Sequence, residues 1–233
     1  MMAIVISNRR TAEGIYVMHA EGRFEARPGQ FFMVRGWGGY PLLSRPLSVY
    51  DQDETGVKFL YKAAGEGTAL LSRLRPGDDV ALLGPLGNGF PLAQAQGRVA
   101  LVGGGIGIAP LYYAARHLER ADLYLGFSEE AYEEREFRAL GHPVEINLGG
   151  IVLDTVDFDA YDTVWVCGPE PMLRAAQIKS GLSSGRADVY LSLENRMACG
   201  VGACLVCSVG SPGGRRKACV DGPVFRAGEV VLA

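Results

Sequence analysis

Four cysteines close to the C-terminus constrain this chain more than any other feature of its sequence. Their spacing is Cys199-x4-Cys204-x2-Cys207-x11-Cys219. Thiolates are soft ligands that suit both iron–sulfur clusters and zinc, but a zinc ribbon usually contains two C-x2-C pairs, and only Cys204 and Cys207 form one here. An x4 spacing followed by an x2 spacing and a distant fourth cysteine is typical of plant-type [2Fe–2S] sites. We therefore predict that these four thiolates bind a [2Fe–2S] cluster, with a structural zinc ion as the alternative.

The overall composition is that of an ordinary globular protein. The 233 residues carry a net charge of −3 and are 48% hydrophobic, which allows a sizeable core and indicates no basic surface for nucleic acid. No stretch approaches the ~20 apolar residues of a membrane-spanning helix, and residues 1–10 lack the apolar segment of a signal peptide. We therefore expect a cytoplasmic protein without a membrane or nucleic-acid partner, whose clustered cysteines bind metal and do not form disulfides.

Residues 1–93 contain short segments rich in β-branched and aromatic residues, separated by turn sequences such as Arg75-Pro76-Gly77-Asp78. Short strands between regular turns are typical of a closed antiparallel β-barrel or a sandwich. We expect a β-barrel domain over residues 1–93, with one helix at Ala69–Leu74. The strands predicted in it are Gly14–His19, Gln30–Val34, Leu47–Tyr50, Val57–Ala63 and Asp79–Leu83.

A polar stretch at Gln94–Gly97 ends this region, and strands alternate with helices after it. Such alternation indicates a parallel sheet covered by helices. We predict a Rossmann-like α/β domain at residues 98–189, followed by a small C-terminal [2Fe–2S] domain at residues 190–233. The predicted strands are Val99–Val102, Leu123–Phe127, Val144–Leu148 and Thr163–Val166, and the predicted helices are Pro110–Arg120, Glu129–Leu140 and Pro171–Lys179.

Two short motifs of the barrel region suit a cofactor that carries phosphate. In Arg45-Pro46-Leu47-Ser48, the arginine can pair with a phosphate and the serine can hydrogen-bond a ring nitrogen, although these four residues alone also fit a plain surface turn. Gly65-Glu66-Gly67-Thr68 precedes the predicted helix, with Thr68 as its N-cap, and a helix N-terminus attracts anions. Together with Lys62, these motifs predict a pyrophosphate held between the barrel and this helix.

A glycine-rich loop follows the first strand of the α/β region. It contains Gly103, Gly105 and Gly107, ends at Pro110, and joins a strand to a helix, which is where parallel sheets bind dinucleotides. Its spacing G-x-G-x-G-x-x-P differs from the Rossmann fingerprint, so a tight turn without a ligand is the alternative.

Two carboxylates follow the next strand, in Ser128-Glu129-Glu130. At that place Glu129 can accept hydrogen bonds from ribose hydroxyls, and its charge repels a 2′-phosphate. This favours NAD over NADP. The other interpretation is that these glutamates form the acidic first turn of a helix.

Taken together, these motifs resemble those of the ferredoxin reductase-like superfamily. There, RPLS at Arg45–Ser48 looks like the flavin motif, GGGIGIAP at Gly103–Pro110 the nicotinamide loop, and CGPEPM at Cys167–Met172 the segment near the point of hydride transfer. The resemblance implies that Arg45 binds a flavin phosphate, that Ser48 contacts the isoalloxazine ring, and that Cys167 has a catalytic position beside the nicotinamide. From the local sequence alone, Cys167 is as well explained as a small buried side chain. The FAD-site residues so implied are Arg45, Pro46, Leu47, Ser48, Leu60, Tyr61, Lys62, Gly67 and Thr68.

The segment after Tyr190 is too short for the whole ferredoxin domain of oxygenase reductases. With Glu194, Met197–Cys204 and Cys219–Phe225, it is similar to the cluster segment in electron-transfer subunits of NAD-dependent dihydroorotate dehydrogenases, and the resemblance covers the whole chain. It implies that the FMN of a partner oxidises dihydroorotate to orotate in pyrimidine (UMP) biosynthesis. Electrons then pass singly through the [2Fe–2S] cluster to FAD, which delivers a hydride to NAD⁺. The chain lacks the C-terminal aromatic residue that covers the flavin in plant-type reductases, so the group that shields the flavin is left open.

The partner implied is an FMN-containing dihydroorotate dehydrogenase catalytic subunit, in a heterotetramer with two copies of each chain. His19, His117 and His142 are isolated in the sequence, so we expect the orotate chemistry in that partner. Two other functions fit the same residues. One is an electron-transfer flavoprotein subunit of another complex, such as a ferredoxin:NADP oxidoreductase, a sulfide dehydrogenase or a hydrogenase. The other is a non-catalytic interaction module that binds zinc.

Overall fold

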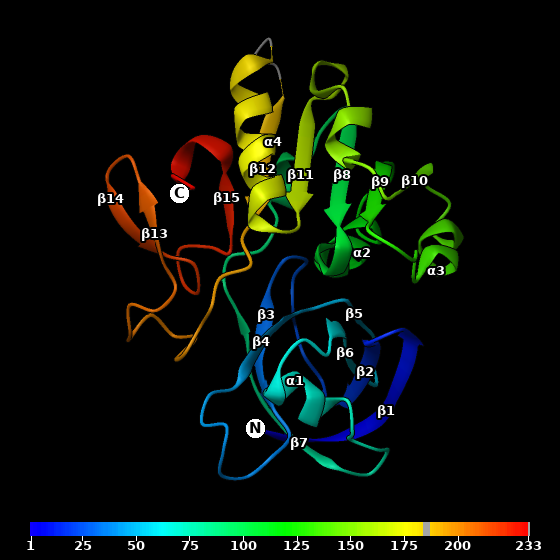
Figure 1. Cartoon of the computed structure of the whole chain (residues 1–233), viewed down its shortest axis with the longest axis vertical. Helices are drawn as coiled ribbons and strands as arrows, with labels where there is room; N and C mark the ends of the chain where they lie inside the picture. The colour runs from blue at the N-terminus through cyan, green and yellow to red at the C-terminus, as the bar shows by residue number, and fades with distance from the viewer. Residues whose placement is uncertain (184–186, 233) are drawn as a thin grey trace.

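Seven strands at the N-terminal end form one antiparallel sheet that curls into a barrel (Figure 1). The computed structural model describes residues 1–183 and 187–232. Aromatic side chains fill the barrel, with Phe32 edge-on to both Phe24 and Phe59, and this confirms the predicted β-barrel. In the sheet order β4-β3-β7-β1-β2-β6-β5, the elements are β1 (Met2–Ala12), β2 (Ile15–Glu21), β3 (Phe31–Arg35), β4 (Arg45–Ser48), β5 (Asp51–Gln52), β6 (Gly56–Lys62) and β7 (Asp79–Leu86), with helix α1 (Glu66–Leu71) between β6 and β7.

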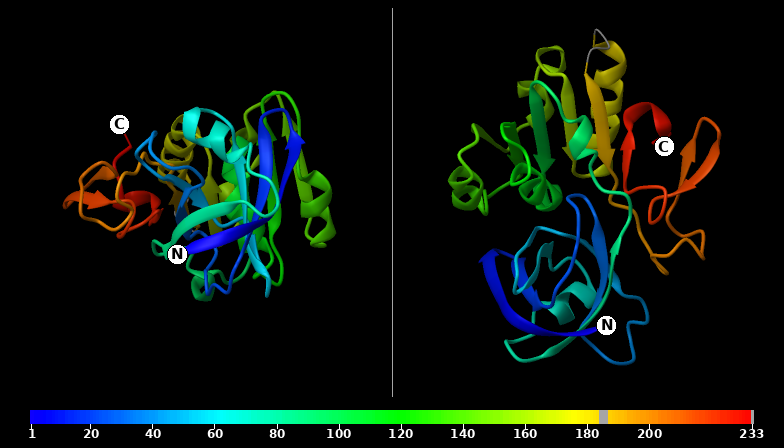
Figure 2. Two further views of the ribbon diagram at one scale, coloured as in Figure 1. Left: turned by 90° about the horizontal axis from the view of Figure 1, so that it is seen from below. Right: turned by 180° about the vertical axis from the view of Figure 1, so that it is seen from behind.

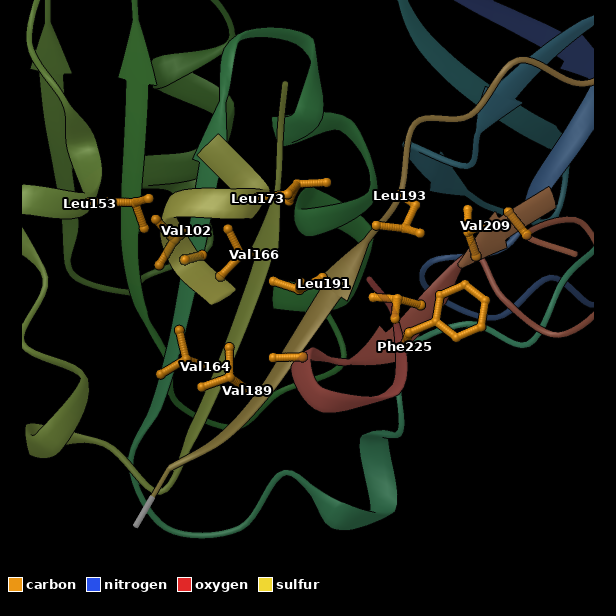
Figure 3. Close-up of a cluster of buried hydrophobic side chains, with 14 of the residues drawn as sticks. Val102, Leu153, Val164, Val166, Leu173, Val189, Leu191, Leu193, Val209 and Phe225 are labelled. Carbon is orange, nitrogen blue, oxygen red and sulfur yellow. The ribbon is translucent and has the colours of Figure 1, made fainter. Parts of the chain in front are cut away.

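The second sheet has the order β10-β9-β8-β11-β12-β15 and is parallel except for β15. Alternate side chains of its central strands are buried on both faces, which explains their continuous apolar sequences. Leu101 packs in the core on the α2 side, whereas Val102 and Val166 pack with Leu173 of α4 on the other (Figure 3). The elements are β8 (Val99–Gly104), α2 (Ile108–Ala115), β9 (Asp122–Phe127), α3 (Glu134–Ala139), β10 (Val144–Leu148), β11 (Thr163–Cys167), α4 (Glu170–Leu182) and β12 (Asp188–Ser192).

The cysteine-rich segment packs on the edge of this second sheet. It contains the hairpin β13 (Ser208–Ser211) and β14 (Gly214–Lys217), and β15 (Val224–Arg226) then pairs with β12. Figures 2 and 3 show the hairpin beside the sheet, with Leu191, Val209 and Phe225 in one continuous core. The predicted boundary between residues 189 and 190 lies within β12. The division of the chain into three domains stays a prediction. Short 3-10 helices occur at Leu92–Gln94, Gly105–Gly107, Val152–Thr155, Phe158–Ala160 and Ala227–Glu229.

Several predicted element limits were wrong. The first strand, β1, was not predicted, because its apolar residues form a run without the alternation expected of a half-buried strand. Helix α1 begins at Glu66, so Thr68 lies inside the helix and Gly65 is the N-cap. Helix α2 ends at Ala115 and not at Arg120. Helix α4 runs from Glu170 to Leu182, longer at both ends than predicted.

The largest error concerns the helix predicted at Glu129–Leu140, because α3 begins only at Glu134. Glu133 has a positive φ of 56°, which interrupts any helix through it. Its carboxylate accepts hydrogen bonds from Arg9 Nη2 at 3.1 Å, Thr11 Oγ at 2.5 Å and Tyr50 Oη at 2.9 Å. All three donors belong to the barrel region. These tertiary bonds therefore hold the loop before α3 against the barrel and override the local helical pattern.

Replacing Glu133 by alanine is expected to lower the free energy of unfolding by about 1–3 kcal/mol, because the buried Tyr50 hydroxyl loses its partner. Urea denaturation measures the change. The matched control is Glu134→Ala, which removes an exposed ion pair with Arg138 and is expected to cost less than about 0.5 kcal/mol. Equal effects of the two substitutions would contradict the anchoring role of Glu133.

Within residues 1–183 and 187–232, no helix combines the length and the apolar character needed to cross a membrane. The longest of the described helices, α4, has 13 residues.

Candidate functional site

The barrel, the α/β sheet and the cysteine-rich segment meet at a cavity of about 410 Å³. Strands β4 and β6 form one wall, the start of α2 forms the second, and Ser192–Met197 forms the third. The cavity is mainly apolar with a few polar groups, which is the usual character of a cofactor site. Six residues predicted for the FAD site line it: Pro46, Leu47, Ser48, Leu60, Tyr61 and Lys62. Their individual roles stay predictions.

Arg45 and Gly67, two further predicted FAD residues, are in contact. A Cβ atom on Gly67 would lie 2.4 Å from Arg45 Nε and 2.6 Å from its Nη2, so only glycine leaves room for the guanidinium there. The Arg45 guanidinium also lies 5.4 Å from the ring centre of Trp37 and donates to the carbonyl oxygen of Leu43. The packing thus positions a cation beside α1, one residue before the cavity-lining Pro46, as a phosphate-binding arginine requires.

The hydroxyl groups of Tyr61 and Thr68 are engaged within the protein. Tyr61 donates to Asn8 Oδ1 at 3.0 Å, and burial raises its pKa above the usual value for tyrosine. Thr68 Oγ accepts the backbone N–H groups of Ala64 and Gly65 at 3.0 and 3.1 Å. Thr68 is therefore not the predicted N-cap; it closes the turn that leads into α1.

The glycine loop of the α/β sheet packs closely on the segment that follows β11. A Cβ atom on Gly107 would lie 2.5 Å from the carbonyl oxygen of Cys167, and one on Gly104 would lie 2.4 Å from the sulfur of Met172. Gly103 lies within β8, whereas Gly105 and Gly107 belong to the 3-10 turn before α2. The loop therefore brings Ile106 and Ala109 into the cavity wall, where the sequence predicts the nicotinamide.

Cys167 is only 1% exposed, at the end of β11 behind this loop. Burial raises the pKa of its thiol well above the usual value, with a further contribution from the charge of Glu194, while a hydrogen bond with Ser192 acts in the opposite direction. The thiol is therefore neutral and does not line the cavity. Its predicted catalytic position beside the nicotinamide stays a prediction.

Glu129 is exposed in the loop after β9 and does not belong to a helix. The interpretation of Glu129 as part of an acidic first helical turn is therefore wrong, because that turn of α3 contains Glu134 and Glu136. The loop follows the carboxyl end of a parallel strand, where dinucleotides bind in such sheets. Binding of ribose by Glu129 stays a prediction.

The third cavity wall, which includes Glu194, was not predicted from the sequence. The cavity walls raise the pKa of the Glu194 carboxyl by limiting its hydration, although part of the side chain is exposed to the cavity. The apolar run Val189–Leu193 could have indicated this wall, because most of it belongs to the strand β12, which pairs in parallel with β11, and ligands bind at the carboxyl ends of such strands.

The four cysteines of the predicted cluster lie in two pairs. Cys207 and Cys219 are buried, with their Sγ atoms 3.3 Å apart. Cys199 Sγ contacts the Cys204 thiol and accepts hydrogen bonds from backbone amides, including Cys204 N at 3.4 Å. These amides lower the pKa of the Cys199 thiol to about 6, which favours the thiolate that iron binds. Burial, followed by the neighbouring Cys207 thiol, raises the pKa of Cys219 to about 11.

The paired arrangement favours an iron–sulfur cluster over zinc. A structural zinc ion needs four ligands around one centre, whereas a [2Fe–2S] cluster is held by four thiolates distributed over two irons. The donor set and the amides aimed at sulfur therefore fit the predicted cluster.

The cysteine-rich segment is also bound directly to the barrel region. Asn88, two residues after β7, donates from Nδ2 to the carbonyl oxygens of Asp221 at 3.1 Å and Val224 at 2.8 Å. A Cβ atom on Gly87 would lie 2.6 Å from Pro223. The same segment forms the third cavity wall through Met197, two residues before Cys199. The cavity and the cysteine cluster are therefore adjacent.

The barrel, the glycine loop on a parallel sheet and the cavity between them define a ferredoxin reductase-like protein, with a cysteine-rich segment added. A solved structure of an NADH-dependent reduced ferredoxin-NADP oxidoreductase aligns with a TM-score of 0.88 at 29% identity, covering 100% of this chain and 90% of the other. A ferredoxin NADP⁺ reductase from Neisseria gonorrhoeae shares the fold, with a TM-score of 0.65 at 14% identity over 83% of this chain and 98% of the other.

Sequence comparison identifies the family. The family model for the iron–sulfur cluster binding domain of dihydroorotate dehydrogenase B matches residues 194–231. The dihydroorotate dehydrogenase B (NAD(+)) electron transfer subunit of Clostridium acetobutylicum is 42% identical over 238 residues, covering 98% of this chain and 96% of the relative. The corresponding subunit of Geobacillus kaustophilus is 45% identical over 253 residues, covering 98% and 97%. The chain therefore belongs to the family of dihydroorotate dehydrogenase B (NAD(+)) electron transfer subunits, which confirms the resemblance found in the sequence.

Proposed function

We propose that this chain takes electrons from the FMN of a partner dihydroorotate dehydrogenase subunit and passes them through a [2Fe–2S] cluster and FAD to NAD⁺. It is an oxidoreductase subunit that binds FAD and the cluster, with NAD as co-substrate, and it acts in pyrimidine biosynthesis. Bound FAD supplies the exchange between the single electrons of a cluster and the hydride of NADH. The protein holds these groups close together and sets their environments.

One observation carries the proposal: the segment Ser192–Met197 lines the cavity and leads directly to Cys199. A flavin in the cavity and a cluster on the four cysteines would thus share one wall. Only Ala198 separates the cavity-lining Met197 from the first cluster ligand, Cys199. Membership of the family and the thiol pairs support the same assignment.

The protein's own residues have distinct parts in this proposal. Arg45, held by Gly67 and Trp37, binds a phosphate of FAD. Ser48 donates a hydrogen bond to the flavin ring within the cavity. The apolar walls exclude water from the ring. Glu129, at the end of β9, accepts hydrogen bonds from a ribose of NAD.

The partner in this proposal is the FMN-containing catalytic subunit, in a heterotetramer with two copies of each chain. Exposed apolar side chains beside the cluster ligands, Leu205 at 73% and Val206 at 54% exposure, support docking of that subunit near the cluster. A cytoplasmic location is part of the proposal, because four free thiols persist where the medium is reducing.

A visible and EPR spectrum of the protein, purified and reconstituted without air, tests the proposal. We expect flavin absorbance, two irons with acid-labile sulfide per chain, and an EPR signal of a reduced [2Fe–2S] cluster after addition of NADH. Zinc without labile sulfide, in a colourless protein, would contradict it.

A second candidate is an electron-transfer subunit of a ferredoxin:NADP oxidoreductase complex. The alignment at a TM-score of 0.88 with such a structure favours it, whereas the higher identity of 42–45% to dihydroorotate dehydrogenase B subunits favours the first. Co-purification separates the two. A partner that contains FMN and oxidises dihydroorotate supports the first candidate, and a large flavoprotein with several clusters supports the second.

A further inference from the structure

The ammonium group of Lys217 lies against the loop that carries the first cluster ligands. Its Nζ atom donates to the carbonyl oxygen of Gly202 at 2.6 Å, and the side chain is half-buried. Gly202 lies between Cys199 and Cys204, and Lys217 lies two residues before Cys219. A positive charge is therefore held between the two parts of the chain that bring the four thiols together.

The peptide groups before and after Gly202 both act on cysteine sulfurs. Its own N–H donates to Cys219 Sγ at 3.2 Å. The next N–H, that of Ala203, belongs to the same peptide group as the Gly202 carbonyl and is one of the backbone amides that lower the pKa of the Cys199 thiol. A cation on a carbonyl oxygen polarises the peptide and strengthens its N–H as a donor, because hydrogen bonds in a chain reinforce one another. The positive charge of Lys217 therefore acts on the Cys199 sulfur through the peptide group that joins Gly202 and Ala203.

The surrounding structure fixes Lys217 in this position. Its backbone N–H donates to Asp221 Oδ2 at 2.7 Å, and it pairs with Ser208 across the β13–β14 hairpin, next to Cys207. Arg215 and Arg216 lie on the same strand, but they are exposed, and neither forms a hydrogen bond to the cysteine loop in the described part of the chain. The hairpin therefore carries three positive charges, of which Lys217 contacts the loop.

We propose that Lys217 is a positioning residue that raises the reduction potential of the [2Fe–2S] cluster. This inference rests on the proposed function, in which the cluster accepts one electron at a time from the partner's FMN and passes it to FAD. Each reduction adds one negative charge to the cluster and forms no bond. Positive charge and hydrogen bonds at the sulfurs stabilise that added charge, and both raise the potential.

Lys217→Met tests the proposal by an anaerobic redox titration followed by EPR, which reports on the cluster and not on turnover. We expect a midpoint potential more negative than that of the wild type, with a change on the order of tenfold in the one-electron equilibrium, or about 59 mV. Lys217→Arg keeps the charge and should restore most of the potential. Arg215→Met is the matched control, since it removes an equal but exposed charge and is expected to leave the potential unchanged.

The outcomes separate a role in tuning from a role in folding. A fully loaded Lys217→Met protein with the wild-type potential, or an equal shift in Arg215→Met, overturns the proposal. If Lys217→Met loses the cluster, Lys217→Gln keeps a donor for the Gly202 carbonyl without the charge. A more negative potential in that variant supports the proposal, and a wild-type potential or loss of the cluster there overturns it. Wild-type protein that holds no iron after reconstitution refutes the proposed function itself.

Discussion

Replacing Cys204 by serine is expected to abolish electron transfer between this chain and its dihydroorotate-oxidising partner, while oxidation of NADH by an artificial acceptor at FAD continues. Serine removes one of the soft thiolate ligands and also the partner of Cys199 in its pair. The cavity-lining residue Met197 lies seven positions before Cys204 in the sequence, and the walls formed by β4 and β6 contain none of the four cysteines. Stopped-flow and steady-state assays of both reactions, on protein with measured iron and FAD content, provide the comparison.

The matched control for this substitution is Cys167→Ser, which changes a cysteine outside the cluster. Its iron and sulfide content is expected to equal that of the wild type, because Cys167 is buried at the end of β11, away from the four ligands. Should Cys204→Ser lose both activities equally in a folded protein that retains FAD, the proposed order of carriers is wrong.

Gly67→Ala is expected to weaken FAD binding by about 10- to 100-fold with little loss of stability of the apoprotein. Alanine normally stabilises a helix relative to glycine by up to about 1 kcal/mol. Here, however, its Cβ would occupy the position of the Arg45 guanidinium, 2.4 Å from Nε. The flexible arginine can move aside, so the fold survives, but a charged hydrogen bond to phosphate of about 1.5–3 kcal/mol is lost. Titration of apoprotein with FAD, followed by fluorescence, measures the dissociation constant.

Gly65→Ala is the control for this effect, since nothing lies within 4 Å of a Cβ atom at that N-cap position. Its FAD affinity is expected to stay within a few-fold of the wild type. Comparable weakening in both variants would show that the loop, and not the placement of Arg45, controls FAD binding.

Local patterns predicted most of the strands because their apolar runs are sufficient signals. The segments Val99–Val102 and Thr163–Val166 lie within β8 and β11 as expected. The helices were less predictable. α3 begins late because Glu133 binds three residues of the barrel, and no pattern within Glu129–Leu140 contains that information. Thr68 has an N-cap residue type, but its hydroxyl closes the turn that precedes it.

The sequence by itself determined the chemistry available to this protein: four thiolates at cluster spacing, an arginine–serine motif and a glycine loop after a strand. Residue type and short spacing are sufficient for this, because ligand softness and turn geometry are local properties. Tertiary structure alone decided that Ser192–Met197 closes the cavity, that Gly67 makes room for Arg45, and that Lys217 reaches the Gly202 carbonyl. Such contacts join residues that are distant in the chain, and only the packing of the sheets and the hairpin brings them within bonding distance.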